Sequence, residues 1–493
     1  MRLHDEDGQA VVFVALAMSF FLLGAVGLAL DGSHLYAQRQ MAQTAADAAA
    51  QAGIMSIFDG TNGTGSGGFS TSSTITCTTT DLRTPCKYAS LNGFGSTSSD
   101  TVTVSFPANT AAPGVSFSSD PVHLIQVTVQ RTVSTTLVHM VGPAAATVTA
   151  TALAAIVSVQ SPVPILVTHP TLSNSFTLQG TPAVQICGGP SKSIQINSGS
   201  ATAVSLGGSS SVDLSKAGPL DSGTCTTGTG ADFGNWGGPA AQPGGITTGV
   251  GQYVDPASPI QDPLAGISPP SVPATAPAPA ALTNGVSGCP ASPKKGCMLY
   301  SPGLYTGGID GKNSTPVFKP GIYYIQSTAG FVCTSNCDMY MATGFTDGST
   351  GTNTGWTGNM LVYNTGPSGS ASNAGAFNLG ANGSIDLVGS PTSSAYQGIL
   401  LFQDRSSAAV SHSLGGGGNL QLMGTIYLTN TLATMTATPT QYQSLSLQGG
   451  SGNTTTIQGE IIVGALSMGG NGGITMDLNA AESTTVRQIA LVQ

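Results

Sequence analysis

Residues 10–30 read AVVFVALAMSFFLLGAVGLAL, an apolar run without a charged side chain. A helix rises about 1.5 Å per residue, so these residues would span the roughly 30 Å hydrocarbon core of a bilayer. A cleaved secretory signal is the alternative, but its apolar part is usually only about 7–15 residues long. No clear small-x-small cleavage site breaks the continuation of the run into Asp31. The run therefore predicts an uncleaved, single-pass transmembrane helix.

The residues before this run say little about its orientation. They set Arg2 and His4 against Asp5, Glu6 and Asp7, whereas the positive-inside rule needs an excess of basic residues. The eight cysteines that follow are more informative, because disulfides persist outside the reducing cytosol. We therefore expect a cytoplasmic N-terminus and a periplasmic or extracellular body.

The cysteines lie mostly in closely spaced pairs. Taken in chain order, they suggest four disulfides: Cys77 with Cys86, Cys187 with Cys225, Cys289 with Cys297, and Cys333 with Cys337. Eight cysteines allow roughly a hundred connectivities, and the sequence does not choose among them. A zinc site of Cys289, Cys297, Cys333 and Cys337 is the alternative, but its spacings differ from those of zinc knuckles. We predict no metal site and no cofactor.

The helix is expected to continue past the apolar run to about residue 58. Small residues recur on it at four-residue spacing in two lines: Ala42, Ala46 and Ala50, and Ala45, Ala49 and Gly53. Alanine simply favours helices, but small residues at this spacing also permit close approach of a second helix. Both interpretations stay open at this point.

The N-terminal 58 residues or so resemble the TadG/TadE-like proteins of bacterial tight-adherence (Tad), Flp-type pilus systems. The likeness begins at Gly8-Gln-Ala-Val-Val12 and continues through the apolar run. The family positions fall on Asp31, Tyr36, Arg39, Gln43, Ala45, Ala46, Asp47, Ala48, Ala49 and Ala52. The resemblance implies an inner-membrane protein that works with other Tad pilus-assembly proteins or pilins.

Two features of related proteins are missing. Prepilins that are cleaved by a peptidase carry a Glu five residues after the processing Gly, and counting from Gly8 this position is Phe13. Many TadG-like proteins have a von Willebrand A domain with an Asp-x-Ser-x-Ser metal site. The two nearest matches here start at Asp404 and Asp213 and lack the last Ser. The resemblance therefore favours an uncleaved TadG-like protein without that metal site.

The composition indicates that the body is mainly β. Charged residues make up 7% of the chain and Gly accounts for 67 of 493 residues, so the strong helix formers are scarce. The formal net charge is −9, and we find no basic patch that would neutralise a nucleic-acid backbone. Nucleic-acid binding is therefore not expected.

Three segments follow the helix. Residues 59–74 predict a flexible linker, and alternating apolar residues in 100–106 and 125–130 predict strands of a small α+β module over residues 75–161. Residues 162–493 consist of short strand-like runs separated by Gly, Asn and Ser. They predict a right-handed parallel β-helix, or solenoid, with a Pro-rich insertion at about residues 239–293. A β-sandwich is the alternative.

Catalytic chemistry is not expected. Beyond the leader, the chain has only the glutamates Glu460 and Glu482, a thin supply for a paired-carboxylate site. One group of candidate side chains lies close together in sequence: Asp386, Asp404, Arg405 and His412. Exposed acid–base pairs of this kind are common and contribute little.

We therefore expect a non-enzymatic, membrane-anchored structural component of a Tad-type pilus, with an adhesive body. Surface carbohydrate or a second copy of the chain are further partners that a Gly/Ser/Thr-rich surface allows. The alternatives are a membrane-tethered β-helical enzyme acting on polysaccharides and a secreted adhesin.

Overall fold

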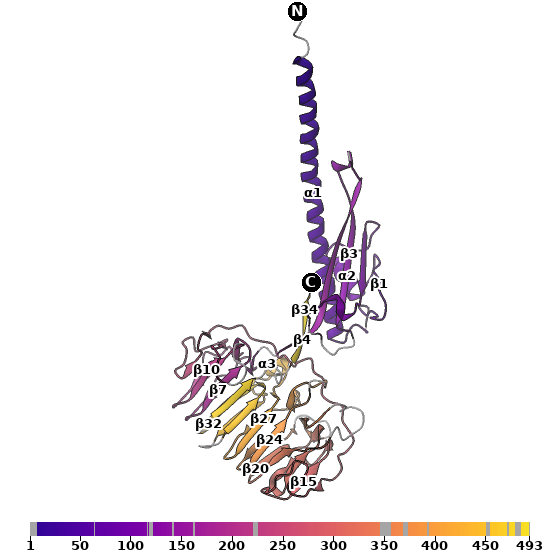
Figure 1. Cartoon of the computed structure of the whole chain (residues 1–493). Helices are drawn as coiled ribbons and strands as arrows, with labels where there is room; N and C mark the ends of the chain where they lie inside the picture. Colours follow the sequence, from indigo (N-terminus) through magenta and orange to yellow (C-terminus); the bar gives the residue numbers. More distant parts are fainter. Residues whose placement is uncertain are drawn as a thin grey trace, which may run out of the picture. The chain divides into compact units, whose positions relative to one another are not determined.

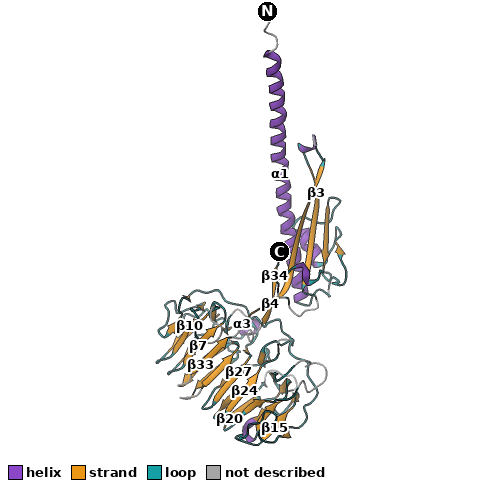
Figure 2. Cartoon of the chain, in the orientation of Figure 1, coloured by secondary structure: helices purple, strands orange, loops and turns teal. Residues whose placement is uncertain are grey.

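The computed structural model describes residues 7–63, 65–115, 117, 122–140, 142–160, 163–219, 225–345, 356–367, 373–391, 394–449, 454–470, 473–478 and 485–492. The protein is mainly β, with an N-terminal apolar helix and sheets of parallel strands (Figures 1 and 2). It divides into two compact units. Unit 1 comprises Met1–Val159 with Arg487–Gln493, and unit 2 comprises Gln160–Val486.

Unit 1 combines one long helix with a five-stranded sheet. The helix α1 (Asp7–Phe58) has 52 residues. The strand order is β1 (Ile75–Thr76), β2 (Asp100–Ser105), β3 (Leu124–Ser134), β4 (Ala145–Gln160) and β34 (Thr485–Leu491). The pairs from β1 to β4 are antiparallel. The described residues of the unit also form the short helices α2 (Thr84–Leu91), η1 (Asn109–Ala111) and η2 (Val138–Met140).

The second half of α1 packs on β3 and α2 of its own unit. Both lines of small residues are used there, because all six of their members are buried. At Gly53, a Cβ would lie 2.6 Å from Cδ1 of Ile125. The close approach that small residues permit is thus made to this unit rather than to a partner helix.

Residues 59–74 differ from the flexible linker that we expected. Phe69 is 6% exposed and belongs to the core of unit 1. Its ring stacks on Phe106 with a centroid distance of 6.1 Å. The linker prediction was wrong because it relied on the Gly/Ser/Thr composition and gave no weight to Phe69, whose burial holds the segment against unit 1.

The C-terminus also differs from expectation, because it does not belong to the second domain. Strand β34 neighbours β4 in the sheet of unit 1 (Figure 1), and the N–H of Val492 donates to the carbonyl of Leu153 at 3.0 Å. Unit 2 is therefore inserted between two adjacent strands of the sheet of unit 1.

Unit 2 contains three sheets. The eleven-stranded sheet runs β12 (Ile246–Thr247), β10 (Ser211–Ala217), β7 (Ala183–Gly188), β33 (Gly473–Leu478), β30 (Thr454–Gln458), β27 (Asn419–Met423), β24 (Ser384–Val388), β21 (Met339–Met341), β18 (Thr315–Phe318), β15 (Cys297–Tyr300) and β14 (Ala280–Ala281). The ten-stranded sheet runs β13 (Tyr253–Val254), β11 (Asp232–Asn235), β8 (Lys192–Ile196), β5 (Ile165–Val167), β31 (Ile461–Val463), β28 (Thr425–Leu428), β25 (Ile399–Gln403), β22 (Met360–Thr365), β19 (Gly321–Gln326) and β16 (Gly303–Tyr305).

The eight-stranded sheet runs β17 (Ile309–Asp310), β20 (Phe331–Ser335), β23 (Phe377–Ala381), β26 (Ser411–Leu414), β29 (Ser444–Gly449), β32 (Ala465–Gly470), β6 (Phe176–Leu178) and β9 (Val204–Leu206). Short helices η3 (Gly311–Asn313) and α3 (Leu432–Ala437) lie between strands. Among the described strand pairs of unit 2, only β14 with β15 is antiparallel.

Successive strands visit the three sheets in turn. The chain passes from β5 through β6 and β7, and then returns to the ten-stranded sheet as β8, next to β5. A complete circuit therefore adds one strand to each sheet and stacks its side chains on those of the previous circuit, whereas the chain from β11 to β13 adds no strand to the eight-stranded sheet. The inward rows form one continuous apolar core.

The order of the circuits is not the order of the chain. The first circuits, from β5 to β13, form one end of unit 2. The last strands, β31, β32 and β33, pair with the free edges of β5, β6 and β7, so that Ile461 pairs with Ile165, Leu466 with Phe176 and Ile474 with Val184. In Figure 1 the yellow C-terminal strands accordingly lie between the magenta strands and the orange ones. The first and last strands of unit 2 are therefore neighbours, as an insertion between β4 and β34 requires.

Residues 255–281, here called the return segment, connect the two ends of unit 2 within the predicted Pro-rich insertion. The segment follows the ten-stranded sheet: the amide of Asn197 bonds Ile260 twice, at 2.7 and 3.0 Å, and Thr275 forms a bridge to Leu304. Strands β22, β25 and β28 are consequently buried at every residue, whereas β24 and β27 of the eleven-stranded sheet alternate. Parallel strands covered on both faces show such continuous burial.

Four disulfides join Cys77 to Cys86, Cys187 to Cys225, Cys289 to Cys297 and Cys333 to Cys337. These are the pairs suggested by chain order. They leave no free thiol, so the cysteines considered for zinc are not available as ligands.

Candidate functional site

The first half of α1 presents apolar side chains that unit 1 does not cover. Phe20 and Phe21 are 73% and 72% exposed, and Val11, Phe13 and Leu28 are similarly exposed. Starting at Val11, the helix is long and apolar enough to cross a membrane. Exposed apolar surface of this extent marks a binding or membrane surface.

The apolar half ends at a fixed junction with the β3–β4 turn. The Asp31 carboxylate, 5% exposed, accepts hydrogen bonds from the N–H groups of Thr136 (3.0 Å), Leu137 (2.9 Å) and Val138 (2.7 Å). The bonds from Val138 and Thr136 hold the pKa of Asp31 below its usual value, because they stabilise the charged form. A carboxylate thus satisfies the free N–H groups where η2 begins.

Gly27 brings the same turn against the helix one turn earlier. A Cβ on Gly27 would lie 2.9 Å from Cβ of Leu137, closer than real Cβ atoms come. The absence of a side chain at Gly27 therefore allows the contact.

The other family positions divide into two groups. Ala45, Ala46 and Ala49 are fully buried against the sheet. Gln43 donates to the carboxylate of Asp47 at 2.8 Å and to the carbonyl of Thr151 on β4 at 3.2 Å.

The remaining family positions lie farther from the sheet. Ala48 and Ala52 are half-buried. Tyr36 is 65% exposed and Arg39 is also exposed. The buried set holds α1 in place, and the exposed pair faces away from the unit.

An ion pair that the sequence analysis missed ties α1 to the sheet. Arg131 Nε donates to Asp100 at 2.6 Å and its Nη1 donates to Gln38 of α1 at 3.1 Å. The guanidinium also stacks over the Phe94 ring, 3.9 Å from its centroid. The Arg131 hydrogen bond lowers the pKa of Asp100. Asp100 begins one predicted strand and Arg131 directly follows the other, but only the register shows that they are opposite each other.

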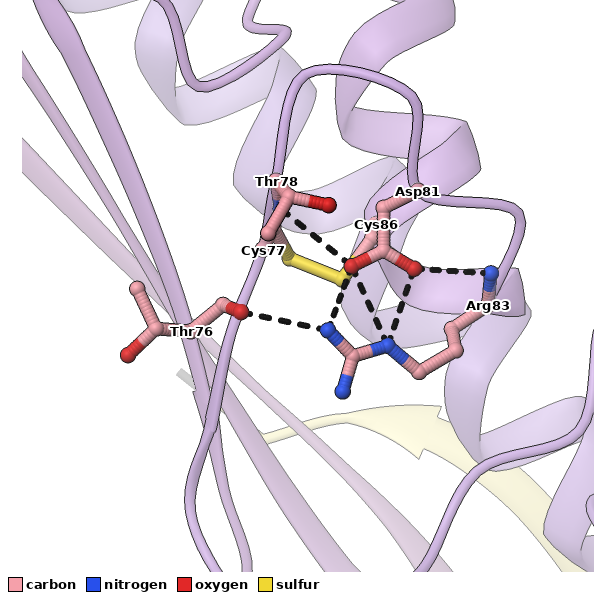
Figure 3. Close-up of polar contacts among 6 residues, drawn as sticks. All are labelled: Thr76, Cys77, Thr78, Asp81, Arg83 and Cys86. Carbon is pink, nitrogen blue, oxygen red and sulfur yellow. Dashed lines mark hydrogen bonds and ion pairs between the residues drawn. A yellow bond between two sulfur atoms is a disulfide. The ribbon is translucent and has the colours of Figure 1, made fainter.

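The Cys77–Cys86 loop contains a second ion pair (Figure 3). Arg83 Nε donates to Asp81 at 2.8 Å, and Nη2 of Arg83 contacts the same carboxylate and the carbonyl of Thr76. This hydrogen bond lowers the pKa of Asp81. Cys77, Asp81 and Cys86 lie close enough together to ligate a metal. Both sulfur atoms form the disulfide, however, so these contacts stabilise the loop.

The structure does not bring the candidate catalytic residues together. Asp386 is exposed on β24, Asp404 accepts from Ser406 and Thr365 after β25, and Arg405 donates to the carbonyls of Ala265 and Ile267 in the return segment. His412 is 1% exposed on β26, where Nδ1 accepts from the N–H of Phe377 at 3.1 Å. Asp386, Asp404 and His412 lie on or beside strands of three different sheets, and Asp404, Arg405 and His412 are hydrogen-bonded to structural partners.

Burial also shifts the pKa values of two histidines and two acids of unit 2; one of these acids is Asp386, whose pKa is raised. Burial lowers the pKa of His412 to about 4 and lowers that of His169. Burial raises the pKa of Asp262, whose carboxylate accepts from the Tyr427 hydroxyl at 2.5 Å. Asp262 lies in the Pro-rich segment, where no sequence pattern marked it.

Among the described residues of unit 2, a cavity of about 10 Å³ is lined by Leu414, Leu447, Met468 and Ile474, among others. It is apolar and has room for no more than a water molecule. The helix α1 therefore remains the best-defined functional feature.

The fold and this feature define a class: proteins with an N-terminal apolar helix that can serve as membrane anchor or signal, followed by a mainly β body. Residues 8–56 match the family model "Putative Flp pilus-assembly TadE/G-like". The match spans nearly all of α1, and the predicted resemblance is confirmed for this region.

Two other comparisons add little. The crystal structure of the competence-associated pilin ComZ from Thermus thermophilus matches over 80% of this chain and 84% of that one, with 9% identity and a TM-score of 0.23. At that score the two folds are not established as alike. None of the curated proteins matches the sequence.

Proposed function

We propose that the protein is a membrane-anchored structural or assembly component of a Tad-type (Flp) pilus, with its N-terminus in the bacterial cytoplasm and both units beyond the inner membrane. One observation carries the proposal. The residues that match the pilus-assembly family form a single helix whose first half is apolar and exposed, and whose second half is built into a folded unit.

The junction supports an anchor over a cleaved signal. Cleavage before Asp31 would separate Gly27 from Leu137 and leave the Asp31 carboxylate beside a new N-terminal ammonium group. The packing of Leu137 on Gly27 joins the apolar half to unit 1. Tyr36 and Arg39, which are exposed on the same helix, are available to other Tad pilus-assembly proteins or pilins.

The body is proposed to be a right-handed parallel β-helix rather than a β-sandwich. Support comes from the cyclic visits to three sheets and from the parallel pairing, and parallel crossovers are nearly always right-handed. The domain plan is then an anchor, a small α+β unit and a solenoid.

An adhesive role is proposed for the open outer face of the eight-stranded sheet. Ser413, Ser446, Ser467, Thr177 and Ser205 are in register on successive strands and are partly or fully exposed. A flat row of hydroxyl groups repeating at the strand spacing of about 4.8 Å offers hydrogen bonds to carbohydrate or to another copy of the chain.

Cell fractionation with N-terminal sequencing tests the anchor. We expect an intact N-terminus in the inner-membrane fraction, resistance to alkaline extraction, and digestion of the body by protease added to spheroplasts. A control variant with Gly24→Lys and Ala25→Lys in the apolar run should be released from the membrane. An N-terminus near Gln9 or Asp31, with the protein in the medium or in sheared pili, would contradict the proposal.

A further inference from the structure

The turn between β3 and β4 is fixed to α1 at one level. Leu137 packs on Gly27, and Asp31 holds the N–H groups of Thr136, Leu137 and Val138 at 2.7–3.0 Å. Gly27 and Asp31 are one helical turn apart. Contacts at both residues prevent the turn from sliding along the helix.

This level lies inside the apolar run. Gly27 stands three residues before the end of residues 10–30, so Leu137 lies about 5 Å deeper along the helix than Leu30. Within the described part of residues 11–30, Gly27 is the one buried residue, and its neighbours Val26 and Leu28 are 50% and 69% exposed. The turn thus shares its level with side chains assigned to the membrane.

The chemistry of the turn suits lipid. Residues 132–144, TVSTTLVHMVGPA, contain no Asp, Glu, Lys or Arg. Its N–H groups at residues 136–138 are satisfied by Asp31, and Thr135 closes its base by donating to Ala144 (3.0 Å) and Pro143 (2.6 Å). Backbone polar groups need such internal partners in a membrane.

We propose that this turn is a second membrane contact, inserted beside α1 into the interfacial zone of the extracytoplasmic leaflet with Leu137 and Val138 against acyl chains. The proposal rests on the proposed anchoring of α1. Interfacial segments bury their apolar side chains by about 5–10 Å, in agreement with the depth given by the helix rise. The second contact sets the depth of unit 1 and keeps the Asp31 carboxylate at the membrane edge.

Bromolipid quenching of tryptophan fluorescence tests the contact in the full-length protein. The variant Val138→Trp is reconstituted in phosphatidylcholine vesicles, with or without lipids brominated near the headgroup. The native tryptophans, Trp236 and Trp356, both belong to unit 2 and give the background. We expect the added emission to be blue-shifted and to fall by roughly half or more, because the bromine atoms lie at the interfacial depth.

Two matched variants separate this proposal from the anchor itself. Val14→Trp, four residues inside the other end of the apolar run and therefore about 6 Å deep, should be quenched by the same lipids. Thr132→Trp, on the stem of the hairpin, should not be quenched. Quenching at residue 14 without quenching at residue 138 would overturn the turn contact and leave the anchor intact. No quenching at residue 14 would overturn the anchor.

The exposed neighbour His139 provides a second position if Val138→Trp does not fold. His139→Trp should show the same headgroup-level quenching. A photocrosslinker at residue 139, used in native membranes, should yield lipid adducts. A discrete protein adduct in place of lipid would overturn the proposal and make a partner helix the occupant.

Discussion

Each unit covers one face of a sheet with a distant part of the chain, but the covering segments differ in kind. Unit 1 uses the second half of α1, a regular helix whose alanines sit directly on the strands. Unit 2 uses the return segment, which has almost no regular structure and attaches through Asn197, Tyr427 and Arg405. A helix satisfies its own backbone and can be held by packing, whereas an irregular segment needs side-chain partners for its exposed N–H and C=O groups.

The ionisable groups differ in the same way. The perturbed acids of unit 1, Asp31, Asp81 and Asp100, have lowered pKa values because hydrogen-bond donors stabilise their charge. In unit 2, burial favours the neutral forms of His412, His169 and Asp262. Asp404 is an exception there, because its burial is outweighed by hydrogen bonds from Ser406 and Thr365, which lower its pKa. The shifted acids of unit 1 therefore stabilise the fold in their charged forms, whereas charging the three buried groups of unit 2 destabilises it.

The largest expected effect comes from the aromatic ladder beneath the return segment. The ring centroids of Tyr363 and Phe402 lie 5.3 Å apart, and those of Phe402 and Tyr427 lie 5.0 Å apart. Because Phe402 is fully buried, Phe402→Ala should lower the free energy of unfolding of unit 2 by about 3–5 kcal/mol. Urea unfolding followed by tryptophan emission measures this change, since both tryptophans lie in unit 2.

A control for this prediction is Ser446→Ala on the open eight-stranded sheet, which should change the midpoint little. The signal of α1 in far-ultraviolet circular dichroism should keep its own midpoint in Phe402→Ala. If the midpoints of tryptophan emission and circular dichroism shift together, the two units unfold as one, and their stabilities cannot be compared separately.

Acid should destabilise unit 2 before unit 1. His412 has a pKa of about 4 in the folded protein, against an ordinary value of 6.5. Between these values the unfolded state binds a proton that the folded state does not, so stability is present above pH 6.5 and is lost as the pH falls toward 4. The loss should be about 3 kcal/mol, at about 1.4 kcal/mol per pKa unit.

Other groups with shifted pKa values limit the pH range over which this loss of stability is expected. Asp262, whose pKa is raised, acts in the opposite direction, because its folded form takes up a proton first as the pH falls. The lowered acids of unit 1 keep their stabilising effect until the pH falls below 3.8. Tryptophan emission as a function of pH should therefore report loss of unit 2 structure before the helix signal changes, and His412→Gln should flatten that slope. An unchanged slope in His412→Gln would mean that other groups cause the pH dependence of unit 2 stability.

The ion pair of Arg131 provides a smaller effect in unit 1. Arg131→Ala removes bonds to Asp100 and Gln38 and leaves the Asp100 carboxylate without its main partner. The pair is partly exposed, so we expect a loss of about 1–3 kcal/mol, less than for a fully buried pair. The circular dichroism of α1 measures it.

The conservative variant Arg131→Lys should recover only part of the loss, because lysine lacks the planar fork. A double-mutant cycle with Asp100→Asn isolates the pair. Strict additivity in that cycle would mean that the two side chains do not interact.

The sequence predicts well those features that depend on local chemistry. Three such features are the apolar run, the alanine lines and the closely spaced cysteines. Each is recognised from residues that lie a few positions apart in the sequence. The alternation around Val102 and Val127 likewise marks strands with one buried face. These features needed no knowledge of distant partners.

Long-range pairing could not be predicted in this way. Ile165 would fit beside Ile461 or beside any other aliphatic strand of unit 2, because parallel circuits have nearly equivalent edges. The same applies to β34, whose sequence marks a strand but not its partner. The contacts of Asp262 with Tyr427 and of Leu137 with Asp31 join residues more than a hundred positions apart, so no local pattern identifies them.

Arg405→Lys should have the smallest effect on global stability. It tests most directly whether the return segment is held by side-chain hydrogen bonds, whereas α1 is held by packing. Arg405 donates to the carbonyls of Ala265 and Ile267 with two nitrogens, and a single ammonium cannot reproduce that fork. Because the return segment can open without unfolding the sheets, the global cost should be about 1 kcal/mol or less. Amide hydrogen exchange at residues 262–270 should nevertheless become faster.

The matched control is Arg83→Lys in unit 1. Arg83 makes a comparable fork with Asp81, but the Cys77–Cys86 disulfide closes its loop independently. Exchange in that loop should therefore change little. Equal protection of residues 262–270 in the parent and in Arg405→Lys would mean that apolar packing, as in α1, also holds the return segment, and the difference between the two units would disappear.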